Sequence, residues 1–421
     1  MICLSQSKGI GGSIKKSPED FLVKEIAQCG KVLEPGTKYL ASDLGATADP
    51  QGKFSAIVLE KRGWDTIRAL QTIAKRLGRG VRSIGYAGMK DRMSKSTQLA
   101  SIFGAQPEAL GRISIKDISI NGAWKSTNGI GMGDLLGNAF EIVVAGADQD
   151  IEKVMRIEEE LGGVMPNYFD AQRFGSRLNN FKIGMHILRN ELEEAVLEFL
   201  TATSNETNQA AVEARRRLAE ENDFAAALGY FPGYLKGERT MLYSLSKEPT
   251  DFAKAIRAMP RGISIMFIHS VEALVFNRSV EMMAKERNFN AARLRCKNDF
   301  YGFPDVSLVG PEGTTPVSAL IGYETSEERI NSYESQIMNG LGIGRESFRI
   351  KSMPELSMRG SFRPVLSTFK NFGASALGDD VKLGFELPAG AYATILISEF
   401  TKSGSLDLDL ISPSMKEDRK D

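Results

Sequence analysis

A glycine-rich turn that ends in a single carboxylate is the stretch of this sequence best suited to chemistry. Residues 85–92 read Gly-Tyr-Ala-Gly-Met-Lys-Asp-Arg, so Asp91 stands between Lys90 and Arg92. Neighbouring positive charge favours the ionised form of a carboxyl group, and an ionised Asp91 could serve as a nucleophile or base on a polyanion. A solvated surface turn explains the same residues, because paired acids are often only structural.

Two groups of basic residues could contact phosphates. Within 18 residues the chain carries Lys75, Arg76, Arg79, Arg82, Lys90 and Arg92, with Asp91 as the one acid among them. Such density could follow an RNA backbone, but cations also suit the C-terminal end of a solvated helix. The run 215–217 is three arginines with glutamates at 213, 220 and 221, which favours surface ion pairs at helical spacing over RNA contact.

Two aromatic segments could hold an unstacked base. Residues 167–175 read Asn-Tyr-Phe-Asp-Ala-Gln-Arg-Phe-Gly and combine amide, aromatic and guanidinium groups, which are the three kinds of group that bind a flipped nucleotide. Residues 388–394 read Pro-Ala-Gly-Ala-Tyr-Ala-Thr and put Tyr392 at the start of a helix among small neighbours. Each segment is also explained by core packing.

The composition excludes several kinds of site. The chain has 421 residues with 53 basic and 53 acidic side chains, so a bound polyanion would need a local basic patch. The cysteines at 3, 29 and 296 lie far apart and form no framework, which indicates a reducing compartment. Two histidines, His186 and His269, argue against a His-rich metal site or a His-based triad.

The sequence also bears on location. We find no apolar run of about 20 residues, the length that crosses a bilayer. Residues 1–12 are polar and rich in glycine and serine, unlike a secretory signal. We therefore expect a cytoplasmic protein with no membrane association.

The N-terminal part is predicted to mix strands and helices. Residues 21–26 alternate after a turn at 17–20, as a half-buried strand does. Asp65 can cap a helix that Gly78 ends. The apolar face of that helix is predicted to be Ile67, Leu70, Ile73, Ala74 and Leu77. Further strands are predicted at 38–41, 54–60, around Ile84, and at 98–103, 112–120 and 139–144, and a helix at 148–161.

From about residue 181 to 356 the pattern is mainly helical. Helices are predicted at 183–201, 205–228, 252–259, 267–287 and 326–338, with a Gly/Pro-punctuated strand region at 301–323. A mixed pattern restarts at 359–364, followed by a strand at 381–387, a turn at 388–390, a helix at 391–400 and a frayed tail at 412–421. The simplest organisation is one catalytic domain, residues 1–180 and 357–421, with 181–356 inserted into it.

Taken together and in this order, the motifs resemble the TruD family of tRNA pseudouridine synthases. The resemblance rests on 18–25 (PEDFxVxE), 87–98 (AGMKDR with Thr97 and Gln98), 167–175 (NYF with QRFG) and 387–399 (LPAG with Tyr392, Ala393, Thr394 and Glu399), and on a weaker stretch at 273–278. Asp170 replaces the usual glycine, which we expect to make that turn more demanding in backbone angle. Ser94 replaces the usual alanine, and we expect neither to touch the candidate nucleophile.

The resemblance implies an α+β fold. The catalytic domain would be a twisted mixed, largely antiparallel sheet with flanking helices, and the insertion would be a mainly helical TRUD domain. It implies isomerisation of uridine, usually uridine 13 of tRNA, to pseudouridine without metal or other cofactor. Its partner would be tRNA, bound in a cleft between the two domains, and we expect a monomer.

The resemblance also implies roles for residues at the catalytic turn. Asp91 would be the catalytic nucleophile, although sugar attack, addition to the uracil ring and removal of a sugar proton all remain open. Lys15 would pair with Asp91, or Lys16 if the alignment is shifted by one residue. Lys90 is the third catalytic candidate.

The remaining candidates would bind the substrate. The target uridine must leave its stack, which costs a few kcal/mol. Phe169 would stack on it and Tyr392 would close the pocket, while Asn167 would read the uracil edge. Arg173 would either bind a phosphate group or have a structural role, and Glu25 would orient the pocket.

Two other functions use the same residues differently. A non-catalytic RNA-binding protein or RNA chaperone would need the basic and aromatic side chains of the cleft but not Asp91. A metal-dependent RNA hydrolase would need clustered acids, which the sequence does not offer.

Overall fold

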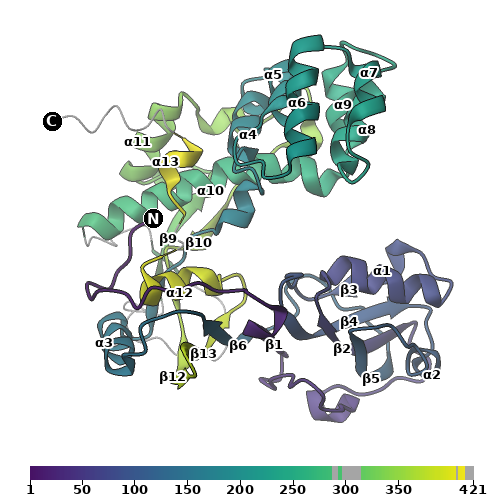
Figure 1. The fold of residues 1–421 in the computed structure, drawn as a ribbon, viewed down its shortest axis with the longest axis vertical. Coiled ribbons are helices and arrows are strands. Elements are labelled where there is room, and N and C mark those ends of the chain that lie inside the picture. The colour runs from purple at the N-terminus through teal and green to yellow at the C-terminus, as the bar shows by residue number, and fades with distance from the viewer. Residues whose placement is uncertain (287–292, 296–313, 404–405, 413–421) are drawn as a thin grey trace.

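The computed structural model describes residues 1–286, 293–295, 314–403 and 406–412. A sheet-containing part and a helical part meet along one long helix, α10 (Arg261–Glu286), which crosses the middle of the molecule (Figure 1). Cys296, the predicted strands at 301–313 and most of the predicted tail lie outside the described residues.

The main sheet has eight strands in the order β12-β13-β6-β1-β4-β2-β5, with β3 also pairing β4. Every pair is antiparallel except β1 with β4, where Leu22 lies opposite Lys95. The sheet is therefore mixed and largely antiparallel, as the sequence predicts. The strands are β1 (Phe21–Ile26), β2 (Phe54–Arg62), β3 (Ile84–Tyr86), β4 (Lys95–Phe103), β5 (Ile118–Ser126), β6 (Gly137–Val144), β12 (Lys370–Leu377) and β13 (Asp380–Pro388).

Strand β2 shows how alternation builds two cores at once. Ile57 and Leu59 pack under helix α1 (Thr66–Arg76), whereas Ala56 and Val58 belong to a separate cluster under residues 33–44. Successive side chains of a strand point to opposite faces, so one apolar run fills both layers. Beside it, the other half of the sheet packs against α3 (Ile151–Leu161) and α12 (Ala393–Thr401).

Helix α1 follows its prediction closely. The Asp65 side chain accepts a hydrogen bond from the Arg68 N–H at 2.8 Å, and the chain turns at Gly78, whose φ of +67° suits glycine. Leu70 and Ile73 are fully buried, but Ile67 is 37% exposed, so the predicted apolar face begins one turn too early.

Some predicted strands are wrong. Residues 38–41 form no strand, because the Asp43 carboxylate accepts from the Leu40 N–H and starts a short 3-10 turn, Ala41–Leu44. The strand predicted at 112–120 begins only at Ile118, after a short helix α2 (Pro107–Leu110) and a turn. Strand β12 was not predicted, since its Gly/Ala/Ser-rich, mostly exposed residues carry little apolar signal.

Two predicted helices break at asparagine. Residues 183–201 are two helices, α4 (Asn180–Leu188) and α5 (Leu192–Thr201), separated at Asn190, whose φ is +61°. Residues 205–228 are likewise split at Asn222, which has φ of +50°, into α6 (Gln209–Glu221) and α7 (Phe224–Tyr230). Asparagine tolerates this left-handed conformation better than most residues. The other helices here are α8 (Lys236–Leu245), α9 (Phe252–Ala258) and α11 (Ser332–Leu341).

Helix α10 is the central helix of the molecule. It is longer than the predicted 267–287 and begins at Arg261, directly after Pro260. By length and composition alone it could cross a membrane, but 78% of its apolar window is buried inside the protein. That burial is typical of a core helix, which packs apolar residues on all sides.

Two small sheets join the sheet-containing and helical parts. Strand β10 (Ser361–Pro364) pairs with β9 (Thr314–Leu320), which in turn pairs with β8 (Arg293–Arg295). Strand β11 (Leu366–Thr368) pairs with β7 (Val164–Pro166). Residues 361–364 therefore pair with a strand of the predicted insertion and not with the main sheet. The domain boundaries at 180 and 357 stay a prediction.

Candidate active site

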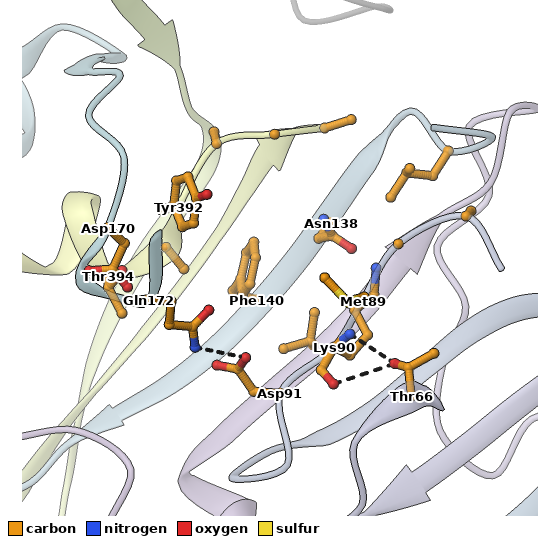
Figure 2. A pocket seen from close by; sticks show the side chains of 18 of the residues that line it. Thr66, Met89, Lys90, Asp91, Asn138, Phe140, Asp170, Gln172, Tyr392 and Thr394 are labelled. Atoms are coloured by element: carbon orange, nitrogen blue, oxygen red, sulfur yellow. Dashed lines mark hydrogen bonds between the residues drawn. The ribbon is translucent and has the colours of Figure 1, made fainter. Parts of the chain in front are cut away.

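A cavity of about 740 Å³ opens where the β3–β4 loop faces β6 and the turn before α12. Figure 2 shows Asp91, Lys90, Phe140, Gln172 and Tyr392 around it. Its volume lies within the usual range for small-ligand sites. Six segments of the sequence, 15–23, 65–67, 87–92, 132–140, 170–172 and 389–394, thus supply one site, and the sheet sets their spacing.

The loop that carries Asp91 is fastened along its length. Gly88 accepts through its carbonyl from Gln98 Nε2 at 3.0 Å, and the Lys90 N–H donates to Thr66 Oγ1 at 2.9 Å. Thr66 in turn donates to Gln98 Oε1 at 2.8 Å. Buried backbone groups need such partners, and here side chains of α1 and β4 provide them. The loop therefore presents Asp91 in one defined position.

The Asp91 carboxylate has one partner for each oxygen. Oδ2 lies 2.6 Å from Lys15 Nζ, and Oδ1 accepts a hydrogen bond from Gln172 Nε2 at 2.9 Å (Figure 2). Burial acts to raise the pKa of Asp91, but the Lys15 hydrogen bond and charge, with Gln172 and Lys61, hold it below its usual range. Asp91 is therefore anionic at neutral pH while 34% of its side chain stays exposed.

Lys61 lies behind the catalytic loop and was missed in the sequence. Its side chain is 1% exposed, and Nζ donates to the carbonyls of Trp64 at 2.7 Å and Asp91 at 3.0 Å. Burial lowers its pKa to about 8, which the charge of Asp91 partly opposes. The sequence did contain a signal for Lys61, because it continues the inward-facing series of Ile57 and Leu59. A lysine at such a buried position usually has a polar or charged partner.

The cations that keep Asp91 ionised are not its chain neighbours, which corrects the sequence-based expectation. Lys90 turns away, and its Nζ lies 2.9 Å from Glu25 Oε2. Both side chains are buried, at 4% and 0% exposure, and Glu25 Oε1 accepts from the Leu99 N–H at 2.9 Å. The pair thus ties the loop to β1 and β4, and the orienting role expected of Glu25 stays a prediction. A catalytic role for Lys90 stays a prediction.

Lys15, and not Lys16, makes the contact with Asp91. Lys15 adopts a left-handed conformation with φ of +62°, which a non-glycine residue rarely does. Its Nζ also lies 4.4 Å from the centre of the Phe21 ring. Backbone strain of this kind occurs often at functional sites.

The aromatic candidates divide between the cavity and its wall. Tyr392 occupies the position before the first residue of α12 and lines the cavity, whereas Phe169 is only 6% exposed and is not among the lining residues. The two rings meet edge to face with centres 6.3 Å apart. Phe140, missed in the sequence, lines the cavity from β6. Stacking of Phe169 on the uracil stays a prediction. In this structure the Phe169 ring packs against the Tyr392 ring.

Asn167 and Arg173 also lie outside the cavity lining. Asn167 donates through Nδ2 to the Pro364 carbonyl at 2.9 Å, and its Oδ1 accepts from Arg363 Nη2 at 2.6 Å. Arg173 lies over the Phe169 ring at 4.9 Å. Their roles in substrate binding stay predictions.

Two of the expectations for the departures from the family motif are wrong. Asp170 has φ of −80° and ψ of 167°, so its backbone is ordinary extended chain and makes no special demand. It lines the cavity. Ser94 Oγ donates to the Asp91 carbonyl at 2.7 Å, so this serine does contact the residue that carries the carboxylate.

Four residues of the other two basic groups are held by protein partners. Arg217 pairs with Glu221 at 2.8 Å on the surface, as predicted, whereas Arg215 is buried against Glu238 at 2.6 Å. In the N-terminal group, Arg76 and Arg79 bind backbone carbonyls, which favours the helix-end interpretation for those two. Within the described residues no three His, Cys, Asp or Glu side chains gather as metal ligands would.

Comparisons with known proteins bear on the whole chain. A family model described as tRNA pseudouridine synthase D (TruD) matches residues 2–299 and 306–400. A protein of Methanopyrus kandleri named probable tRNA pseudouridine synthase D is 36% identical over 392 residues, which cover 92% of this chain and 93% of that protein. An Archaeoglobus fulgidus protein of the same name is 30% identical over 422 residues, covering 95% and 97%.

The fold leads to the same family. A crystal structure described as tRNA pseudouridine synthase D (TruD) from Methanosarcina mazei matches with a TM-score of 0.70 and 26% identity, covering 96% of each chain. The predicted resemblance and fold class are thereby confirmed. The chain belongs to the TruD family of tRNA pseudouridine synthases, enzymes that isomerise uridine in RNA.

Proposed function

We propose that this protein converts uridine 13 of tRNA to pseudouridine, with Asp91 as the catalytic carboxylate. The observation that carries the proposal is the Asp91 side chain itself, held by Lys15 and Gln172 at the edge of the 740 Å³ cavity. It is ionised, oriented and still accessible. A nucleophile or base needs all three properties.

The reaction breaks the bond from the sugar C1′ to uracil N1 and forms a bond from C1′ to C5. C5 then loses its proton and N1 gains one, so the isomerisation needs no oxidant or reductant. Sugar attack, ring addition and removal of a sugar proton all begin from anionic Asp91. Lys15 keeps it anionic, and Gln172 fixes the direction of the second oxygen.

The target base would enter the cavity after leaving its stack. Tyr392 and Phe140 would contact the uracil ring, since both line the cavity. Phe169 packs against Tyr392 and would stack on the base only after a shift, and Asn167 would have to release Arg363 before it could read the uracil edge. Lys90 and Glu25 would hold the loop in place.

We further propose that the RNA lies in a cleft between the sheet-containing and helical parts, and that the enzyme works as a monomer in the cytoplasm. Residues of the sheet-containing part line the whole cavity, so one chain suffices for it. The exposed Cys29 thiol suits a reducing compartment.

The test is pseudouridine mapping on unmodified tRNA transcripts, with EDTA present. We expect modification at position 13 and none in a transcript that carries cytidine there. Modification at another uridine, with position 13 untouched, would overturn the choice of target but keep the reaction. Binding of tRNA with no pseudouridine at any position would instead favour a non-catalytic RNA-binding protein.

A further inference from the structure

A second cavity, of about 350 Å³, lies beside the active site. We call it the arginine pocket, and it is lined by Phe169, Arg173, His269, Glu272, Leu320, Phe362, Arg363 and Pro364. Its residues come from the Phe169 segment, from α10, and from strands β9 and β10. Phe169 lines this pocket and contacts Tyr392, which lines the first, so the two cavities meet across these rings.

Two guanidinium groups converge on the Phe169 ring. The Cζ of Arg363 lies 4.3 Å from the ring centre and that of Arg173 lies 4.9 Å from it. Burial lowers the pKa of Arg363 to about 10, so it stays cationic at neutral pH. Like charges this close repel each other, and some compensation is needed.

Among the described residues, no carboxylate compensates either arginine. Arg363 donates through Nε and Nη2 to the Asn167 carbonyl, the Asn167 side chain and the Gly390 carbonyl. Within the described part of the chain, the Arg173 side chain donates only to the sulfur of Met266, at 3.4 Å. The acid that lines the pocket, Glu272, pairs instead with His269 at 2.7 Å.

A phosphate group fits this arrangement. Guanidinium groups bind phosphate oxygens with two parallel hydrogen bonds, and Arg363 Nη1 and most of Arg173 have no hydrogen-bond partner among the described residues. The half-buried Phe362 supplies aromatic surface in the same pocket, which a nucleobase can use for stacking. Charge and aromatic surface together favour a nucleotide over a bare anion.

We propose that the arginine pocket binds the phosphate and base of the nucleotide next to the target uridine in the RNA. This inference rests on the proposed function, because it places the neighbouring nucleotide by the position of the target. Residues from both parts of the molecule line the pocket. The helical part would therefore help to select the sequence context of the uridine.

Photocrosslinking tests the inference on the intact enzyme. A tRNA transcript would carry 4-thiouridine either at the target position or at the nucleotide on each side of it, in separate samples. We expect the target label to crosslink to peptides containing Asp91 or Tyr392, and one flanking label to crosslink to peptides containing His269 or Phe362.

The two claims fail differently in this experiment. A target label in the first cavity with neither flanking label in the arginine pocket would overturn the inference and leave the proposed function intact. A target label found away from Asp91 and Tyr392 would contradict the proposed function itself.

Measurements of tRNA affinity give an independent check, in which a positive charge of the pocket is removed in one variant and a negative charge in another. Arg173→Gln should weaken tRNA binding about tenfold, the value of a charge-assisted hydrogen bond. The slope of the logarithm of the binding constant against the logarithm of the salt concentration should also become shallower by about 0.7, the contribution of one phosphate contact on a single strand. Glu272→Gln keeps the size of the side chain but removes a negative charge, so it should tighten binding severalfold.

Arg217→Gln is the matched control, because Arg217 is exposed and paired with Glu221 outside the pocket. It should change neither the affinity nor the salt dependence. Equal weakening by Arg173→Gln and Arg217→Gln would overturn the inference, as would weaker binding in folded Glu272→Gln protein.

Discussion

Two ion pairs in this molecule, one at the rim of a cavity and one buried, use the same chemistry for opposite purposes. Lys15 and Asp91 are 2.6 Å apart and keep 21% and 34% of their side chains exposed at the rim of a cavity. Arg215 and Glu238 are also 2.6 Å apart, but only 1% and 11% exposed, in the helical part. Arg215 is further enclosed by Glu206 and by the carbonyls of Phe199 and Leu200.

The difference lies in what surrounds the charge. Arg215 is enclosed by protein groups and does not border either cavity, so its pair with Glu238 can only stabilise or specify the fold. Asp91 has one protein partner per oxygen and an open side toward the cavity, so a substrate can reach it. A paired acid therefore indicates function when it borders a cavity, and structure when it does not.

Removing Arg215 should produce the largest change in stability. Arg215→Met leaves Glu238 buried without its partner, and breaking a buried pair costs about 3–5 kcal/mol. The free energy of unfolding, measured with denaturant, should fall by that amount, while turnover per folded molecule stays unchanged. Arg217→Met, in the exposed pair, is the control and should stay within about 0.5 kcal/mol of wild type. Full stability in Arg215→Met would remove the structural role.

Removing Lys15 should act on catalysis instead. Lys15→Met deletes a charge-assisted hydrogen bond of about 1.5–3 kcal/mol, which corresponds to roughly a 10- to 100-fold loss of kcat. The pKa of Asp91 should rise toward its usual value, so the acid limb of activity should move to higher pH. Lys16→Met is the matched control and should keep the wild-type profile. A Lys15→Met enzyme with wild-type kcat would make this pair structural too.

Lys61 should make the activity depend on pH in the alkaline range. Its pKa of about 8 means that it loses its charge as pH rises through 8, so kcat should decline there as Asp91 loses a nearby cation. Lys61→Arg keeps the charge and should extend the plateau to higher pH, and an unchanged alkaline limb would contradict the role. Between about pH 8 and 10.5 the unfolded lysine binds a proton that the folded one lacks. The contribution of Lys61 to the free energy of unfolding should therefore increase as the pH rises through this range.

Gln172 should have the smallest effect. Gln172→Ala removes a hydrogen bond to one oxygen of Asp91, and such bonds contribute about 0.5–1.5 kcal/mol. We expect a modest decrease in kcat, measured at saturating tRNA, with no change in the free energy of unfolding because Gln172 is exposed. A loss as large as that of Lys15→Met would show that Gln172 does more than orient Asp91.

The sequence predicts best those elements whose pattern lies within a few neighbouring residues. The loop at Asp91, strand β1 and helix α1 each carry their signal within a few residues, and all three lie where predicted. The helix breaks at Asn190 and Asn222 depend on single left-handed residues inside otherwise helical patterns. Apolar periodicity does not register such residues.

The parts of the site that were missed depend on three-dimensional contacts. Arg363 belongs to no motif, and only the pairing of β10 with β9 brings it beside Phe169. Lys90 has the charge to assist Asp91, yet the buried Glu25 carboxylate draws it away. Sequence order shows which residues are close in the chain, while burial decides which partner each charge takes.

The most direct test of the central claim is to compare wild type with Asp91→Asn for both pseudouridine formation and tRNA binding. The amide keeps the size of the carboxyl group and removes its charge. We predict no detectable pseudouridine with Asp91→Asn and an unchanged Kd for tRNA. Pseudouridine formation by Asp91→Asn at the wild-type rate would contradict the account.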